Sequence, residues 1–210
     1  MISLKVDELT KMYNRKPVLH ELSFEHTTGV LGIAGANGSG KSTLLKCLAY
    51  LVRPNSGSIS WEKEGERFGK VSARTSMGYA APYLNLYDDL TLLENLEFLG
   101  EVSRCRHHED FYPELLARVQ MLDFQHRLFK SLSTGQQQRV KLAAALVRNP
   151  EILLLDEPGS NLDSKGHHLV QQIVEERVKA DKLVIIATND PNELELCDNI
   201  VELSSVLSNK

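Results

Sequence analysis

Short runs of apolar residues recur along the chain and predict a buried parallel sheet. They cover residues 30–34, 152–155 and 183–187. Each run is four or five residues long and contains no alternating polar positions. Such runs are typical of strands that helices cover on both faces. We therefore predict an α/β fold built on a parallel-sheet core.

The N-terminal part of the chain shows a different pattern, in which apolar and polar positions alternate. Residues 2–10 place Ile2, Leu4 and Val6 on one side and predict a strand with one solvent-facing side. Residues 22–24 predict a second strand, and the polar residues between the two predict a turn. We expect a small antiparallel β layer ahead of the parallel core.

From residue 84 to about residue 130 the apolar spacing becomes that of helices. Thr91 and Glu94 form a capping-box pattern, and leucines follow at helical intervals. A second helix is predicted over residues 112–122, and the polar residues 62–73, ahead of this region, predict a loop. We predict an inserted helical subdomain at about 84–130 and a core made of residues 1–83 and 131–210, all within one domain.

Composition narrows the class of protein. The chain has 210 residues, 42% of them hydrophobic, which suits a globular domain with a real core. Its net charge of −4 argues against a nucleic-acid partner, because such partners attract basic surfaces. The three cysteines form no Cys-x-x-Cys pair, and no apolar run is long enough to span a membrane. We expect a cytoplasmic protein that reaches a membrane only through partners.

One stretch carries the strongest chemical signal, a phosphate-binding loop between a predicted strand and a predicted helix. Its residues are Gly35, Ala36, Asn37, Gly38, Ser39, Gly40, Lys41 and Ser42, followed by Thr43. Glycines let backbone N–H groups converge on phosphate oxygens, and Lys41 can reach the β- and γ-phosphates. Ser42 can bind Mg²⁺. The loop predicts a nucleotide site.

Two carboxylates at the end of the run 152–155 give a second signal. Parallel α/β sheets bind ligands at the carboxyl ends of their strands, where Asp156 and Glu157 lie. Asp156 can complete the Mg²⁺ site begun by Ser42, and Glu157 can orient an attacking water or accept its proton.

Residues 132–136 read Leu-Ser-Thr-Gly-Gln and open another predicted helix. Ser133 and Gln136 form a capping box, and this ordinary role is sufficient by itself. The further glutamines and Gly135 in the first turn are unusual for capping alone.

Tyr13 could stack on an adenine ring or be a half-buried tyrosine at a strand end. Asn189 follows the run 183–187 and is expected at the same sheet edge as Glu157. The next residues predict a helix that Asp190 caps, with Pro191 in its first position and Glu193 closing a capping box. The histidine pairs 107–108 and 167–168 could suggest metal, but neighbouring histidines on a helix point in different directions, which favours surface positions.

Together these motifs resemble the ATP-binding subunit of an ABC transporter over nearly the whole chain. The resemblance rests on the phosphate loop, on the signature at 132–136, on the Walker B stretch at 152–157 and on a D-loop at 160–163. It implies the P-loop NTPase fold of ABC ATPases, with ATP and Mg²⁺ as ligands.

The same resemblance implies partners. It predicts a head-to-tail dimer, homomeric or heteromeric, in which ATP lies between one subunit's phosphate loop and the other's Ser133, Gly135 and Gln136. The D-loop residue Asp163 would border the same nucleotide, and Tyr13 would stack on adenine. Separate membrane-spanning subunits would dock near residues 84–110 and hold the protein on the inner membrane.

Three positions depart from the family pattern. Thr134 replaces a glycine of the signature, Pro82 aligns with the family's Mg²⁺-sensing glutamine, and Asn189 replaces its switch histidine. A neutral amide can still donate a hydrogen bond to a γ-phosphate. Because Lys41 and Glu157 are retained, we predict slow but real ATP hydrolysis.

Three functions fit these features. The first is an ATPase subunit that drives transport, with export favoured by the brevity of the chain. The second is a nucleotide-dependent clamp or regulatory subunit with little turnover. The third, a soluble ABC ATPase acting on DNA or ribosomes, fits less well because the chain has no basic arm or second cassette.

Overall fold

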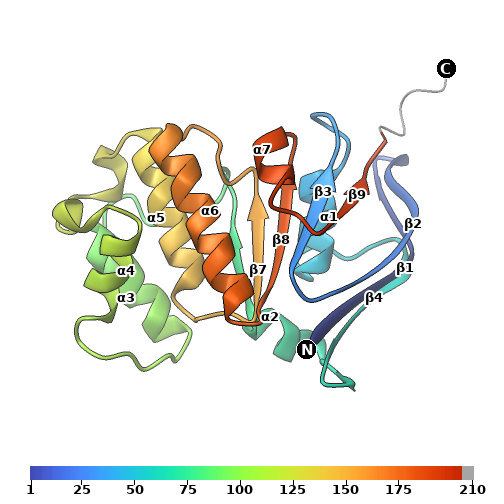
Figure 1. Cartoon of the computed structure of the whole chain (residues 1–210), viewed down its shortest axis with the longest axis horizontal. Coiled ribbons are helices and arrows are strands. Elements are labelled where there is room, and N and C mark those ends of the chain that lie inside the picture. Colours follow the sequence, from blue (N-terminus) through green and yellow to red (C-terminus); the bar gives the residue numbers. More distant parts are fainter. Residues whose placement is uncertain (205–210) are drawn as a thin grey trace.

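A five-stranded parallel sheet forms the centre of the molecule (Figure 1). The computed structural model describes residues 1–204, so residues 205–210 of the predicted core lie outside the described part of the chain. All neighbouring strands in this sheet run parallel, as predicted. In spatial order the strands are β6 (Met77–Ala80), β7 (Ile152–Asp156), β8 (Leu183–Thr188), β3 (Val30–Ala34) and β9 (Asn199–Glu202).

The predicted antiparallel layer is also present, as a second sheet beside the first (Figure 1). Its strands pair in the order β2-β1-β4-β5. Their apolar faces enclose the indole of Trp61, which is fully buried and donates its N–H to the Leu48 carbonyl oxygen at 3.1 Å. The strands are β1 (Ile2–Tyr13), β2 (Lys16–Thr27), β4 (Ser56–Lys63) and β5 (Glu66–Arg67).

Helices cover both faces of the parallel sheet. One apolar cluster joins α1 and the antiparallel strands to one face, and a second joins α5, α6 and the helices after residue 90 to the other. The helices are α1 (Lys41–Leu48), α2 (Lys70–Thr75), α3 (Leu92–Val102), α4 (Phe111–Arg118), α5 (Thr134–Leu146), α6 (Ser164–Lys179) and α7 (Pro191–Leu194). Within residues 1–204, no helix combines the length and the apolar character needed to cross a membrane.

The structure differs from the sequence-based expectations in the connections. Residues 62–73 were expected to be loop, yet they contain β5 and the start of α2. The helix expected at 112–122 ends at Arg118, and residues 122–124 form a short 3₁₀ turn. Strand β5 forms a hairpin with β4. Its polar composition is typical of a loop, and its pairing with β4 does not follow from the local sequence pattern.

Candidate nucleotide-binding site

Strand register brings three predicted site segments to one edge of the parallel sheet. Ala34 pairs with Thr188, and Asp156 pairs with Ala187, so β3, β7 and β8 end side by side. Each strand is fully buried and therefore fixed in position. The phosphate loop, Glu157 and Asn189 leave the sheet from these adjacent ends.

The loop of residues 35–42 is shaped by positive backbone angles. Gly35, Gly38 and Gly40 have φ of 152°, 83° and 105°, which residues with a Cβ rarely adopt. A Cβ on Gly40 would lie 3.0 Å from the Val18 carbonyl oxygen, so this position also requires close approach. The Ser39 hydroxyl is buried and has no hydrogen-bond partner among the described residues. The loop fits an oxyanion that would supply that partner.

Lys41 and Ser42 begin α1 with their polar ends directed at the same pocket. The Lys41 ammonium donates to the Gly35 carbonyl oxygen at 2.6 Å and pairs with a Glu157 carboxylate oxygen at 3.2 Å. Lys41 is only 6% exposed, so its charge is compensated locally. Phosphate oxygens could replace Gly35 and Glu157 as partners of the Lys41 ammonium, so the buried charge would stay compensated.

Asp156 and Ser42 form an oxygen donor set. The Ser42 hydroxyl donates to Asp156 Oδ1 at 3.0 Å, and Asp156 is 1% exposed. Mg²⁺ prefers carboxylate and hydroxyl oxygens and keeps several of its waters. The residues present therefore fit that ion.

Glu157 has an unusual backbone. Its φ is 46°, in the left-handed region, and its N–H donates to the Ala187 carbonyl oxygen at 2.8 Å. A non-glycine residue in this region costs on the order of 1–3 kcal/mol and persists where the surroundings impose it. The turn aims the carboxylate toward Lys41 and away from the sheet. Such strain is concentrated at functional sites.

Asn189 reaches the phosphate loop. Its side-chain N–H donates to the Asn37 side-chain oxygen at 3.2 Å. The structure thus brings the predicted switch position beside the loop, across 152 residues of sequence. Together with Val18, the residues Asn37, Gly38, Gly40, Lys41, Ser42, Thr43 and Glu157 line one pocket, which we call the phosphate-loop pocket.

A separate pocket, here called the signature pocket, lies at the N-terminus of α5. The Ser133 hydroxyl oxygen caps the helix by accepting from the Gln136 backbone N–H at 3.3 Å. In turn, the Gln136 side-chain oxygen accepts from the Ser133 backbone N–H at 3.0 Å. This capping box was predicted and is confirmed. The pocket is lined by Gln120, Met121, Phe124, Ser133, Thr134, Gly135, Gln136, Arg139, Asn161, Leu162 and Asp163.

The D-loop forms the other wall of the signature pocket. A Cβ on Gly135 would lie 2.8 Å from the Asn161 carbonyl oxygen, which explains the glycine. Asp163 caps α6 through the Gly166 N–H and pairs with Arg139 at 2.8 Å. The bond from Gly166, helped by Arg139, lowers the pKa of Asp163.

The two pockets share no lining residue. Figure 1 shows α5 and α1 on opposite sides of β7 and β8. Within one chain, therefore, Ser133, Gly135, Gln136 and Asp163 are not brought together with the phosphate loop.

Tyr13 lies at the end of β1, opposite Lys16 in the β1–β2 hairpin. The tyrosine is 45% exposed, and the Lys11 ammonium lies 5.0 Å from its ring centre. Val18, two residues beyond Lys16, lines the phosphate-loop pocket. The hairpin end that carries Tyr13 thus borders that pocket.

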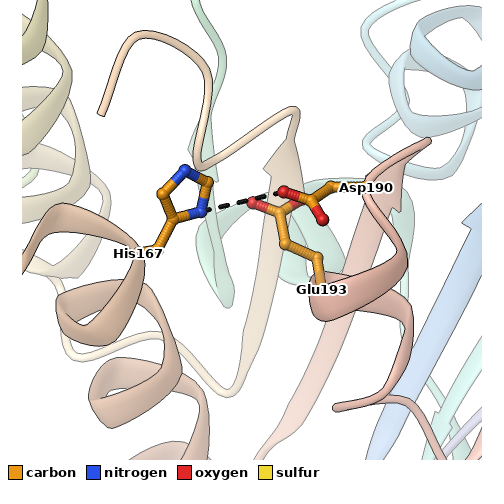
Figure 2. Close-up of side chains that lie close together, drawn as sticks. All are labelled: His167, Asp190 and Glu193. Carbon is orange, nitrogen blue, oxygen red and sulfur yellow. Dashed lines mark ion pairs between the residues drawn. The ribbon is translucent and has the colours of Figure 1, made fainter. Parts of the chain in front are cut away.

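One cluster was missed by the sequence reasoning. Figure 2 shows His167 from α6 facing Asp190 and Glu193 at α7, with His167 Nδ1 3.8 Å from Asp190 Oδ2. Glu193 accepts the buried Gly159 N–H at 2.8 Å, and burial raises its pKa. Asp190 caps α7 and Pro191 follows it, as predicted, but the predicted closing of a capping box by Glu193 is wrong, because its carboxylate accepts from Gly159 instead. These contacts join the D-loop segment, α6 and the segment of Asn189.

The segment at Pro82 is held from two sides. The Pro82 carbonyl oxygen accepts from the Lys141 ammonium at 2.5 Å. The next side chain, Tyr83, is 45% exposed, and its hydroxyl donates to Asp156 Oδ2 at 3.0 Å. No sequence signal pointed to Tyr83.

Comparisons with known proteins agree with this geometry. A sequence model of the ABC transporter family matches residues 19–160. The uncharacterized ABC transporter ATP-binding protein MJ1023 of Methanocaldococcus jannaschii is 32% identical over 95% of this chain and 73% of its own length. The Fe(3+) ions import ATP-binding protein FbpC of Haemophilus influenzae is 37% identical over 90% of this chain, which spans only 56% of FbpC.

Among solved structures, the ATP-binding cassette MJ0796, in a dimeric post-hydrolysis state bound to ADP and Pi, superimposes with a TM-score of 0.84. The match has 27% sequence identity and covers 96% of this chain and 94% of that chain. The parallel core and the antiparallel sheet of this chain therefore form the P-loop fold of ABC ATPases. Motifs, geometry and family match agree: this chain belongs to the ABC transporter family as an ATP-binding, ATP-hydrolysing subunit.

Proposed function

We propose that this chain powers the transport of a substrate across a membrane by slow ATP hydrolysis, working as a head-to-tail dimer beneath separate membrane-spanning subunits. The observation that carries the proposal is the pair of Lys41 and Glu157 at the mouth of the phosphate loop, 3.2 Å apart. Hydrolysis requires a group that can accept a proton from the attacking water, whereas nucleotide binding alone does not, and Glu157 is such a group.

In the proposed reaction, backbone N–H groups of residues 35–42 hold the β- and γ-phosphates, and Lys41 leaves its present contacts to neutralise their charge. Glu157 orients a water for in-line attack on the γ-phosphorus and accepts its proton. A new P–O bond forms as the bond to the β-phosphate oxygen breaks, giving ADP and phosphate. Ser42 and Asp156 would hold Mg²⁺, which would supply positive charge to the phosphate oxygens.

The dimer is proposed because each chain carries two different pockets that it cannot join by itself. Two copies related by a two-fold axis would place each signature pocket over the other copy's phosphate loop, which satisfies both at once. Ser133, Gly135, Gln136 and Asp163 would then border the γ-phosphate, and Tyr13 would stack on the adenine. The dimeric MJ0796 cassette provides a precedent for pairing in this family.

Docking on the membrane-spanning subunits is proposed at a groove between β6 and α3. Apolar side chains that include Leu84, Leu86 and Leu99 line this groove. Part of its lining, Leu84, Asn85, Leu86, Leu99 and Ser103, belongs to the predicted docking region of residues 84–110, and the rest comes from β6, α5 and the residues just after α5. This contact would hold a cytoplasmic protein at the inner membrane.

The direction of transport belongs to those partners. FbpC is named for import, whereas the sequence reasoning favoured export. We retain export only as a direction to be tested by reconstitution, and the substrate is set by the membrane-spanning chains.

The clamp function remains the second candidate, because Asn189 and Pro82 both depart from the family pattern. Asn189 is held by Asn37 through one neutral hydrogen bond. Such a contact gives the γ-phosphate less electrostatic stabilisation than a positively charged imidazole.

Steady-state ATPase activity separates the two candidates. The wild type should hydrolyse ATP. Glu157→Gln should lower the rate about 10²–10³-fold, and Asn189→His should raise it, because a general base and a contact to the γ-phosphate each change rates by such factors. If the wild type binds ATP but hydrolyses it no faster than Glu157→Gln does, even with its membrane partner present, the transport function would be rejected in favour of the nucleotide-dependent clamp.

A further inference from the structure

The metal site of this chain has an unusual neighbour. Asp156 accepts hydrogen bonds on both oxygens, from Ser42 on Oδ1 at 3.0 Å and from Tyr83 on Oδ2 at 3.0 Å. The Tyr79 hydroxyl lies 3.4 Å from the same Oδ2 and contacts the Tyr83 hydroxyl. Two phenol groups thus converge on one oxygen of a buried carboxylate.

Tyr83 is fixed in this position by more than one contact. The Lys46 ammonium lies 4.1 Å from its ring centre, a cation–π contact. Lys46 follows Ser42 by four residues on α1, so both come from the same side of the helix. On the other side, Lys141 holds the preceding carbonyl oxygen of Pro82 at 2.5 Å. The hydroxyl therefore meets Asp156 in a defined geometry.

A tyrosine hydroxyl carries its proton at neutral pH and can donate it in a hydrogen bond. A neutral phenol binds Mg²⁺ poorly, because this ion prefers carboxylates, phosphates and water. The hydroxyl of Tyr83 is therefore suited to act on Asp156 and not on the ion.

We infer that Tyr83 is a positioning residue for the metal site, which orients Asp156 through the hydrogen bond to Oδ2. With Oδ2 held by Tyr83, Oδ1 remains directed toward Ser42, where the ion would bind. Groups that orient metal-binding carboxylates commonly contribute 10–100-fold in metal affinity. The inference rests on the proposed function, since it concerns the same nucleotide site.

The test is Tyr83→Phe, which removes one hydroxyl and keeps the ring over Lys46. It is made in a Glu157→Gln background, so that ATP persists. Binding of Mn²⁺, used as a probe for Mg²⁺, is measured by electron paramagnetic resonance with saturating ATP. ATP affinity is measured separately in EDTA. Tyr87→Phe serves as the control, because Tyr87 is 56% exposed and packs edge-on against Phe98.

We expect Tyr83→Phe to weaken Mn²⁺ binding about tenfold and to leave the metal-free ATP affinity within about twofold. Tyr79→Phe should show a smaller loss, because its contact is longer at 3.4 Å. Unchanged Mn²⁺ affinity in Tyr83→Phe, or an equal loss of ATP affinity in EDTA, would overturn the inference. A parent protein that binds neither ATP nor ATP-dependent Mn²⁺ would instead overturn the proposed function.

Discussion

The phosphate-loop pocket is built from the buried core, whereas the signature pocket is built at the surface. In the first, Lys41 is 6% exposed and Asp156 is 1% exposed. In the second, the Asp163 side chain is 65% exposed, and Ser133 is exposed as well. One pocket is fixed by the strands of the sheet, and the other by the first turn of a helix.

The difference teaches how an ATP site can be divided between two chains. The phosphate-loop pocket contains glycines that shape a cradle and a buried Ser39 hydroxyl without a hydrogen-bond partner among residues 1–204, so it is suited to bind an oxyanion by itself. The signature pocket is already satisfied by its capping box and by the pair of Arg139 and Asp163. In the proposed dimer, this pocket would contact a nucleotide that the other chain holds.

The largest expected effect comes from removing the charge at the first pocket. Lys41→Ala should weaken ATP binding by about 10², because a hydrogen-bonded charge is worth roughly 1.5–3 kcal/mol. Isothermal titration of the isolated chain measures this. Lys130→Ala, which removes an exposed lysine paired with Asp89, is the control and should bind ATP normally. If Lys41→Ala bound ATP as tightly as the control, the phosphate loop would not be the ATP-binding site.

A change at the second pocket should separate binding from turnover. Gly135→Ala places a Cβ 2.8 Å from the Asn161 carbonyl oxygen, which forces α5 and the D-loop apart. Turnover should fall about tenfold, the effect of misplacing a group that acts on the γ-phosphate. ATP affinity of the isolated chain should stay within about twofold. If affinity fell with turnover, the two pockets would not be independent.

The smallest effect concerns the link between the pockets at Glu193. Because burial raises its pKa, the folded state holds a proton more tightly than the unfolded state does. The free energy of unfolding should therefore fall as pH rises from the ordinary glutamate pKa of 4.5 through the raised pKa of Glu193. Glu193→Gln keeps an acceptor for the Gly159 N–H and should lessen this slope. Urea unfolding at several pH values tests this, and an unchanged slope would contradict it.

Local sequence predicted the phosphate loop, the parallel strands and the capping box of Ser133, because each depends on neighbouring residues. Long-range contacts could not be predicted in the same way. The bond from Tyr83 to Asp156 and the pair of His167 with Asp190 depend on segments that meet only in the folded chain. The strained turn at Glu157 likewise depends on its bond to β8.

The central claim is that the two pockets form one ATP site between two copies of the chain. Light scattering of Glu157→Gln, with and without ATP and Mg²⁺, tests it most directly. The account predicts the mass of one chain without ATP and of two chains with it, and a return to one chain in the double variant Glu157→Gln/Gly135→Ala. A Glu157→Gln protein that is saturated with ATP and still has the mass of one chain would contradict the account.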